Sequence, residues 1–563
     1  MSEDEMHGRV VSLYWRLKLI FRIGCGRGRE FFNAVAVVGL VLAVTIICSA
    51  PAQAARQKPN ILYIMTDQQP ISCVAAYGNR IIKTPHLDKL AEAGCTFHSS
   101  YIAAFPCSPS RATQLSGRYA HNHGVVENDV LFDQKIPCLG DVCKAAGYDT
   151  GYFGKWHLGG YMYRCREASR PKNVDGKWFW QRVQNTENYE FEAVPGGLGE
   201  DGSQHGFETW IGGWKHYRAY LQKVGFGETI EKRPRTGCHI DAPSGPDRKH
   251  IYSLFPEEHH VASFLAQNAE QFIRERGEKS RPWCAVLSFY GPHHPVAPPR
   301  PWDMMYTLDQ ITLPANHYDT LKGKPVSQRN ESSCYVLPRW NEGQFKDYIR
   351  RYWGYCSYID KQIGRVLTAL RETDQWNDTI ILFTSDHGDM VGAHGMIFKL
   401  GYCGYEELYR VPTILYVPGM TKPGSRSDAL VSNVDFLPTL LEASGIPVPD
   451  GIDGKSMLPL VRGQTTHHRE IIFADCFNRA LICRDKRYKF VLNWNKRDLD
   501  ELYDLEADPG ELKNLAYVSR HTELAAGMRR QVLDWLRETK HPYVTIISRE
   551  AAKQPHEYKE NSE

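Results

Sequence analysis

Three short apolar segments of this chain share one arrangement, in which a run of buried-type residues is followed at once by polar side chains. NILYIMTD ends at Asp67, CAVLSFYGPHHP contains His293 and His294, and TIILFTSDHGD contains Asp386 and His387. Each run is rich in β-branched or aromatic residues and lacks polar alternation, which is typical of strands buried on both faces of a parallel sheet. Because ligands bind at the carboxyl ends of such strands, we expect these polar residues to meet at one edge.

Helical patterns lie between and after these runs. HLDKLAEAG follows Thr84, LGDVCKAAG precedes Tyr148, and the alternation continues through VPTILYVPG and VDFLPTLLEASG. The segment YIDKQIGRVLTALRE has a core-facing stripe at helical spacing, made of Ile359, Ile363, Val366, Leu367 and Leu370. The sequence therefore predicts an α/β fold with a large, mostly parallel sheet flanked by helices.

The character of the sequence changes after about Arg469. EIIFADC, RALICRDKRYKFVLNW and ELYDLEADP are typical of short strands joined by polar turns, and an amphipathic helix is expected near Leu524–Leu536. We predict a main domain over residues 55–468 and a smaller C-terminal α+β subdomain over residues 469–563. Tyr161–His250 and Leu313–Asn341 have little periodicity and are expected to be insertions that form loops beside the active edge.

Residues 1–54 have the pattern of a signal peptide. A basic run precedes the apolar stretch Ala34–Cys48, and Ala52 and Ala54 follow in the small-x-small pattern that signal peptidase recognises. We predict cleavage after Ala54 and a secreted or periplasmic protein with no membrane contact after cleavage, the alternative being an N-terminal membrane anchor. The whole chain has 68 basic and 65 acidic residues, and residues 1–54 hold six of the basic and four of the acidic ones. The chain after residue 54 is therefore nearly neutral. That balance argues against a nucleic-acid partner.

The polar residues at the strand ends suit a metal ion. Asp67 and Asp386, with the amide oxygen of Gln68, form an oxygen-rich set that favours Ca²⁺ or Mg²⁺ over zinc. Taken singly, each aspartate could instead cap the following helix. Thirteen cysteines follow residue 54, yet the chain has no CxxC pair and no HExxH segment, so a zinc site is not indicated.

One of these cysteines lies in FPCSPSRATQLSGRYAHNHG. Cys107 is followed by Ser-Pro-Ser and Arg111, which predicts a helix start with Pro109 in the first turn. The positive end of a helix stabilises an anionic nucleophile or a bound oxyanion, and Arg111 could hold either one. The alternatives are a buried structural cysteine and one half of a disulfide.

Further cationic side chains accompany this segment. GYFGKWHLGG places Lys155 and His157 two residues apart on a strand-like stretch, so both are expected to face the same cleft. A lysine supplies charge for an anion, and a histidine can move protons near neutral pH. His293 and His294 of PHHP and Lys399 of FKLG complete an anion-binding cluster.

These motifs, in this order, resemble the type I sulfatase family of the alkaline-phosphatase-like superfamily over roughly residues 59–515. CSPSR followed by LSGRY and HNHG is the most specific element, and GKWHLGG, SDHGD and LYDLEADPGELKNLA are similar to further family blocks. In that family the cysteine of CxPSR is oxidised after translation to formylglycine, an aldehyde that hydrates to a geminal diol. The resemblance implies a sulfuric-ester hydrolase with a sulfated substrate and a formylglycine-generating enzyme as maturation partner.

The resemblance also implies the metal site. Cys107, as formylglycine, would be both the nucleophile and a ligand of one ion, Ca²⁺ rather than Mg²⁺. The other ligands would be Asp67, Gln68, Asp386 and His387. Gln68 and His387 depart from the family's commoner oxygen ligands, and imidazole is an unusual partner for Ca²⁺.

The remaining roles follow from the same resemblance. Arg111 and Lys155 would hold the diol, and Lys399 would grip the sulfate. His293 would bind sulfate and protonate the leaving oxygen, and His157 would take a proton from the diol when sulfate is expelled. His294 would replace His293 if the loop is shifted by one residue.

Two other functions fit the same charge pattern. One is hydrolysis of phosphonate or phosphate esters by an enzyme of the same superfamily, and the other is non-catalytic binding of sulfated glycans. A sulfated carbohydrate is the favoured substrate, because aromatic and arginine side chains suit such ligands. The first insertion contains several such side chains, and the alternative is that they pack the insertion against the core. They are Trp178, Trp180, Trp210, Trp214, Tyr217 and Arg218.

Overall fold

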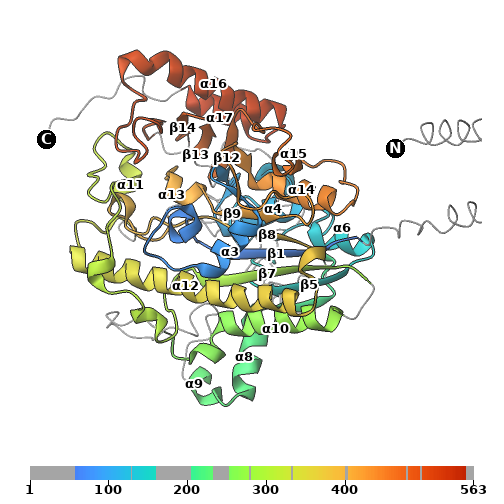
Figure 1. Ribbon diagram of the computed structural model, residues 1–563. Coiled ribbons are helices and arrows are strands. Elements are labelled where there is room, and N and C mark those ends of the chain that lie inside the picture. Colours follow the sequence, from blue (N-terminus) through green and yellow to red (C-terminus); the bar gives the residue numbers. More distant parts are fainter. Residues whose placement is uncertain are drawn as a thin grey trace, which may run out of the picture. The chain divides into compact units, whose positions relative to one another are not determined.

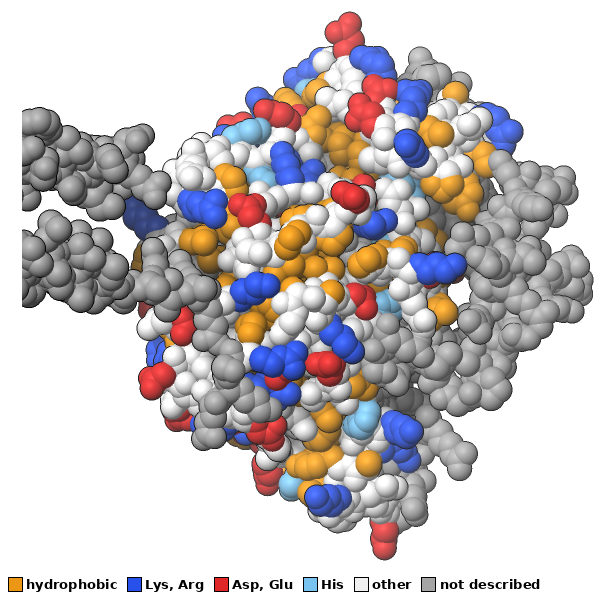
Figure 2. Space-filling model, turned by 90° about the vertical axis from the view of Figure 1, so that its right-hand side faces the viewer, with side chains coloured by type: hydrophobic (Ala, Val, Ile, Leu, Met, Phe, Trp, Pro, Cys, Tyr) orange, Lys and Arg blue, Asp and Glu red, His pale blue; other side chains and the backbone are white. Residues whose placement is uncertain are grey.

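The computed structural model describes residues 58–128, 130–159, 205–231, 253–277, 281–330, 334–399, 403–476, 480–494 and 498–552. They belong to one compact unit, Lys58–Glu563 (Figure 1). Within these ranges, every helix is too short or too polar to cross a bilayer. On the face drawn in Figure 2, positive and negative side chains are interspersed, in line with the nearly balanced charge of the sequence.

The centre of the molecule is the predicted parallel arrangement. Strand β1 (Asn60–Asp67) lies between β7 (Trp283–Pro292) and β8 (Thr379–Ser385) and is parallel to both. Beyond β7 the sheet continues in parallel with β5 (Asp149–Gly154) and β6 (Thr209–Gly212). The three apolar runs of the sequence are therefore adjacent strands of one sheet.

The other half of this sheet changes direction. Beyond β8 come β9 (Thr413–Tyr416), β2 (Cys95–Phe97) and β10 (Ser425–Ser427), which complete eight strands. Strand β9 is antiparallel to both β8 and β2. The large, mostly parallel sheet is confirmed, with β9 as its antiparallel member.

Helices cover both faces of the sheet. On one face, α3 (Pro85–Ala93), α10 (Val261–Arg276) and α12 (Glu342–Glu372) pack against Leu62 and Ile64. On the other face, α4 (Cys107–Ser116), α6 (Leu139–Ala145) and α14 (Phe436–Ala443) pack against the β1 residues that alternate with Leu62 and Ile64. Figure 1 shows α10 and α12 together along one side of the sheet. Successive residues of a strand point to opposite faces, which explains why β1 is apolar throughout.

The predicted stripe on α12 is confirmed. Its five members, from Ile359 to Leu370, are at most 1% exposed. The helix has 31 residues and so extends well before the predicted segment. It begins at a capping box in which Asn341 and Gln344 bond to each other's backbone.

A second sheet contains the predicted C-terminal strands. Strands β12 (Ile472–Cys476), β13 (Ala480–Arg484), β14 (Tyr488–Leu492) and β15 (Glu501–Asp504) form an antiparallel meander, and α16 (Thr522–Glu538) packs against it. The fifth strand, β4 (Ala104–Phe105), pairs with β12 in parallel. This sheet therefore includes a strand that ends two residues before Cys107.

The predicted strand through Lys155 and His157 is wrong in its extent. Strand β5 ends at Gly154, which has φ +116°, and a Cβ there would lie 1.8 Å from the carbonyl oxygen of Ser288. The chain leaves the sheet at this close approach, so strand alternation does not orient the two side chains.

The first insertion is only partly irregular. Its described part contains β6, α8 (Gly213–Lys223) and α9 (Gly227–Glu231). The Trp210 ring stacks on Tyr152 with ring centres 4.8 Å apart, and Tyr217 is 1% exposed in the core, so these two aromatics pack the insertion against the sheet. Trp178 and Trp180 lie outside the described residues, as does the side chain of Trp214. Between residues 313 and 341, only α11 (Val326–Asn330) is helical among the described residues.

Candidate active site

The predicted meeting of polar residues at one sheet edge is confirmed. Asp67 is the last residue of β1, Asp386 follows β8, and His293 follows β7. The backbone N–H of Asp386 donates to the carbonyl oxygen of Thr66 at 3.0 Å, so β1 and β8 end side by side. The carboxyl edge of the sheet therefore carries the candidate site.

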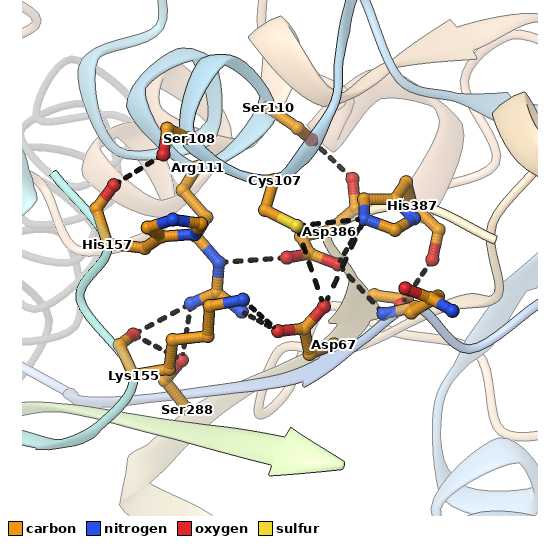
Figure 3. A network of polar contacts seen from close by, with 12 residues as sticks. Asp67, Cys107, Ser108, Ser110, Arg111, Lys155, His157, Ser288, Asp386 and His387 are labelled. Atoms are coloured by element: carbon orange, nitrogen blue, oxygen red, sulfur yellow. Dashed lines mark hydrogen bonds and ion pairs between the residues drawn. The ribbon is translucent and has the colours of Figure 1, made fainter. Parts of the chain in front are cut away.

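Cys107 lies over this edge as the first residue of α4. Its Sγ is 3.1 Å from Nε2 of His387, 3.8 Å from Oδ1 of Asp67 and 2.7 Å from Nζ of Lys399. Figure 3 shows its side chain directed toward Asp67, Asp386 and His387. The thiol is completely buried.

Four of the predicted metal ligands form one cluster. The ligand atoms of Asp67, Cys107, Asp386 and His387 lie within 4.8 Å of one another, and all four residues are buried. The Nδ1 of His387 lies 2.7 Å from the carbonyl oxygen of Gly388, so Nδ1 carries the hydrogen and Nε2 presents its lone pair to the cluster. Two carboxylates and one imidazole lone pair fit a divalent cation.

The fifth predicted ligand, Gln68, borders the same cluster. Its backbone N–H donates to Oδ1 of Asp386 at 2.9 Å. Its side-chain oxygen Oε1 is buried and has no hydrogen-bond partner among the described residues. A buried amide oxygen in that state is costly unless a cation or water pairs with it, which again fits a metal ion.

The positive charges of Arg111 and Lys155 balance the negative charges of Asp67 and Asp386. The Arg111 guanidinium, fully buried, donates from Nε to Oδ2 of Asp386 at 2.8 Å and from Nη1 to Oγ of Ser288 at 2.7 Å. The ammonium of Lys155 forms an ion pair with Asp67. Burial alone would raise the pKa of Asp67, but Lys155 brings it well below its ordinary value, so Asp67 stays ionised.

The surroundings of Cys107 favour negative charge. Burial raises the pKa of its thiol, yet the nearby ammonium groups of Lys155 and Lys399 lower it well below the ordinary value. A hydrogen bond with His157 acts on the pKa in the same direction. A negatively charged group at position 107, or an anion bound beside it, is therefore stabilised.

The other three predicted histidines, His157, His293 and His294, lie at different positions around the cluster. The carbonyl oxygen of His157, which has φ +59°, accepts from Oγ of Ser108 at 2.6 Å, so the loop after β5 is attached to the first turn of α4. Nδ1 of His293 donates to the carbonyl oxygen of His294 at 2.7 Å, and the His293 ring hydrogen-bonds with Cys107. His294 instead bonds to Gln68 and Tyr348. The geometry thus brings His293, and not His294, to the nucleophile position.

Several contributing residues were not predicted from the sequence. Asp389 accepts from Nε2 of Gln68 at 2.5 Å, and the hydroxyl of Tyr352 donates to the carbonyl oxygen of Gln68. The hydroxyl of Ser110 donates to the carbonyl oxygen of Asp386. Asp389 is the last residue of SDHGD and could have been identified from that motif. Tyr348 and Tyr352 lie one turn apart on α12, a spacing that indicates only a core face.

Comparisons with known proteins identify the family of this chain. The family model described as Sulfatase matches residues 59–446, and a model described as N-sulphoglucosamine sulphohydrolase, C-terminal, matches residues 392–538. A choline-sulfatase of Rhizobium meliloti is 30% identical and covers 82% of this chain and 82% of its own length. An N-acetylglucosamine-6-O-sulfatase of Bacteroides thetaiotaomicron is 26% identical, covering 88% of each chain.

A solved structure shows the same fold. The phosphonate monoester hydrolase of Agrobacterium radiobacter has a TM-score of 0.66 and 26% identity, covering 85% of this chain and 96% of that one. The family match includes more than half of the chain and contains β1, Cys107, the loop after β5, and Asp386 with His387. The chain belongs to the sulfatase family.

Proposed function

We propose that this protein hydrolyses sulfate esters of a carbohydrate through a formylglycine derived from Cys107 and one divalent ion. The observation that carries the proposal is the position of Cys107, buried at the start of α4 beside two carboxylates, an imidazole and the ammonium group of Lys399. Among the described residues, this cluster contains no second cysteine with which the thiol could form a disulfide. The surroundings instead suit a nucleophile and an anionic substrate.

We assign the metal site to Asp67, Gln68, Asp386, His387 and the modified side chain at position 107. The ion would neutralise charge on a sulfate oxygen and so favour attack at sulfur. Four oxygen-bearing ligands support Ca²⁺, with Mg²⁺ as the second choice, although His387 adds a nitrogen that Ca²⁺ seldom accepts. Elemental analysis of the purified enzyme identifies the ion.

The other polar residues have roles that follow from charge and proton position. Lys155 and Lys399 supply positive charge beside position 107, which offsets the repulsion between an anionic sulfate and its nucleophile. Because Nδ1 of His293 donates to a carbonyl, Nε2 is the nitrogen left to act, and the imidazolium form of His293 would give its Nε2 proton to the leaving alcohol. His157 would take a proton from the hydroxyl at position 107 as sulfate is released. Arg111 fixes Asp386 and the loop of Lys155.

The substrate class is supported by the relatives. One of them is named as a sulfatase of N-acetylglucosamine, and the C-terminal family match is named for a sulfoglucosamine hydrolase. We propose a sulfated sugar on this basis, and a formylglycine-generating enzyme as the maturation partner. We also propose export through a leader that ends at Ala54, followed by a catalytic domain over residues 55–468 and a C-terminal subdomain to residue 563. The N-terminal sequence of the mature protein tests the cleavage site.

A second candidate is supported by the likeness to a phosphonate monoester hydrolase. Initial rates on matched aryl sulfate and aryl phosphonate substrates separate the two, and faster turnover of the phosphonate would overturn the sulfatase assignment. The mass of the peptide that contains Cys107 decides the nucleophile. Conversion of the thiol to an aldehyde is expected, whereas an unmodified thiol with substrate binding but no turnover would indicate a sulfoglycan-binding protein.

A further inference from the structure

Behind Gln68, three buried side chains and the half-buried His294 form a closed ring of hydrogen bonds. Nε2 of Gln68 lies 2.5 Å from Oδ2 of Asp389 and 3.1 Å from Nδ1 of His294. The hydroxyl of Tyr348 lies 3.1 Å from Nε2 of His294 and 3.5 Å from Oδ1 of Asp389. The four residues come from the end of β1, the loops after β7 and β8, and helix α12. Four separate elements thus meet around the amide of Gln68.

The hydrogens of this ring have one consistent assignment. The amide nitrogen of Gln68 donates one hydrogen to Asp389 and the other to Nδ1 of His294. Nδ1 must then be unprotonated, so Nε2 of His294 carries the ring hydrogen and donates it to Tyr348 Oη. The hydroxyl of Tyr348 donates in turn to Asp389. If the amide were reversed, its oxygen would face the carboxylate of Asp389, and both are acceptors.

This assignment determines where the amide oxygen of Gln68 is. It lies on the side away from Asp389, buried and without a partner among the described residues. Gln68 directly follows Asp67, and its backbone N–H contacts the carboxylate of Asp386, so the residue lies between two proposed metal ligands. We propose that Asp389 is a positioning residue that holds the Gln68 amide with its oxygen toward the ion. The inference rests on the metal site proposed above.

A neighbouring backbone group makes the role of Asp389 testable by an isosteric change. The N–H of Val391 donates to Oδ1 of Asp389 at 2.8 Å. In Asp389→Asn the side-chain oxygen must stay at this N–H, which turns the new NH₂ group toward the NH₂ group of Gln68. Two donors cannot pair, so the Gln68 amide is expected to reverse and to present nitrogen to the ion.

The decisive comparison exchanges the two chemical groups. In Gln68→Glu/Asp389→Asn, one oxygen of the carboxylate introduced at position 68 accepts from the new amide, and its other oxygen faces the ion. Ca²⁺ and Mg²⁺ are titrated by calorimetry into metal-stripped protein. We expect Asp389→Asn to raise the metal Kd about 10–100-fold, the range found when a group that orients a metal ligand is changed. We expect the exchange to bring Kd back to within about threefold of the original protein, a coupling that a double-mutant cycle measures.

A matched control removes a buried carboxylate elsewhere. Asp360 accepts from the backbone N–H groups of His86 and Leu87 at the start of α3. Asp360→Asn is expected to lower Tm and to leave the metal Kd unchanged. Tm is measured for every variant, because loss of folding would also abolish binding.

The other possible results overturn either the positioning role of Asp389 or the metal site itself. Unchanged metal affinity in folded Asp389→Asn, or an exchange variant that binds no better than Asp389→Asn, overturns the positioning role. If both Asp389 variants fail to fold, the ring is structural only and the inference is likewise overturned. If the unaltered protein binds neither ion, the proposed metal site itself is wrong, which separates that failure from a failure of the ring.

Discussion

Cys476, in the C-terminal sheet, pairs with Phe105, two residues before Cys107. The backbone N–H of Asp475 donates to the carbonyl oxygen of Ala103 at 2.9 Å, and Ala103 packs in the core shared by the C-terminal sheet and α16. The segment that presents Cys107 is therefore an edge strand of the second sheet. The C-terminal part of the chain therefore supports the segment that presents Cys107, and none of its described residues belongs to the cluster around that side chain.

A chain that ends at residue 468 is expected to be inactive and unfolded or aggregated. It would leave β4 without its neighbour and expose the apolar surface that β13, β14 and α16 cover. Soluble yield and near-ultraviolet circular dichroism measure this. A chain that ends at residue 552 keeps every described element and is the control. A soluble, active 468-residue chain would contradict the structural role assigned to this pairing.

Substitutions of Cys107 test the nucleophile. Cys107→Ala is expected to lower kcat by about 10³-fold or more, because the attacking group is lost while the charged surroundings remain. Cys107→Ser is expected to release alcohol once per enzyme molecule and then stop, because a serine sulfate ester lacks the second hydroxyl that expels sulfate. Pre-steady-state measurement of alcohol release, with mass spectrometry of the protein, detects both effects. Steady turnover by the serine variant would contradict the diol mechanism.

Lys399 is expected to contribute mainly to the transition state. Its Nζ lies 2.7 Å from Sγ of Cys107 and 3.1 Å from Nε2 of His387. Lys399→Ala is expected to lower kcat about 10²–10³-fold, as for loss of one donor that stabilises developing negative charge. Lys346→Ala, which removes an ion pair with Glu342 on the surface of α12, is the control. A change confined to KM would indicate that Lys399 acts in substrate binding alone.

His293 and His294 are distinguished by their dependence on the leaving group. If His293 protonates the leaving oxygen, His293→Ala lowers kcat/KM about 10²–10⁴-fold for alkyl sulfates and far less for 4-nitrophenyl sulfate, whose leaving group needs no proton. His294→Ala disturbs the Gln68 ring, so its loss is expected to be similar for both substrates. A reversed pattern would assign the acid to His294. Rates on an alkyl sulfate and on a series of aryl sulfates that includes 4-nitrophenyl sulfate provide the measurement.

The sequence predicts the strands of this site because they are buried on both faces. The runs that end at Asp67, His293 and Asp386 are continuously apolar, and such strands lie in the middle of a parallel sheet with their carboxyl ends together. Cys107 is predicted at a helix start because proline and small polar residues follow it. These local signals are sufficient to bring the metal ligands and the nucleophile to one edge.

The remaining features depend on tertiary contacts that have no local signal. Strand β5 ends where Gly154 approaches Ser288, so the position of Lys155 depends on a neighbouring strand. Strand β4 has only two residues, fewer than any periodicity can identify. The ring around Gln68 requires Tyr348, which lies far from it along the chain. Its apolar neighbours on α12 make it resemble an ordinary core residue.

A buried acid outside the active site should give the fold a measurable pH dependence. Glu511 is 1% exposed, forms an ion pair with Lys489, and accepts from the backbone N–H of Glu406 at 2.8 Å. Burial raises the pKa of Glu511, Lys489 lowers it, and the carboxylates of Glu406 and Glu407 raise it again, to about 8 from an ordinary value of 4.5. Between those two pH values the folded protein holds a proton that the unfolded chain releases.

The free energy of unfolding should therefore fall as pH rises. The stabilising contribution of protonated Glu511 is complete below about pH 4.5 and is lost as pH passes through about 8. Glu511→Gln cannot ionise, so its stability relative to the unaltered protein should increase from pH 5 to pH 8 by at most about 1.4 kcal/mol per pH unit. Urea unfolding at several pH values measures the difference, with Glu523→Gln on the exposed side of α16 as control. Parallel stability curves for Glu511→Gln and the unaltered protein would show that Glu511 is ionised throughout and that Lys489 outweighs burial.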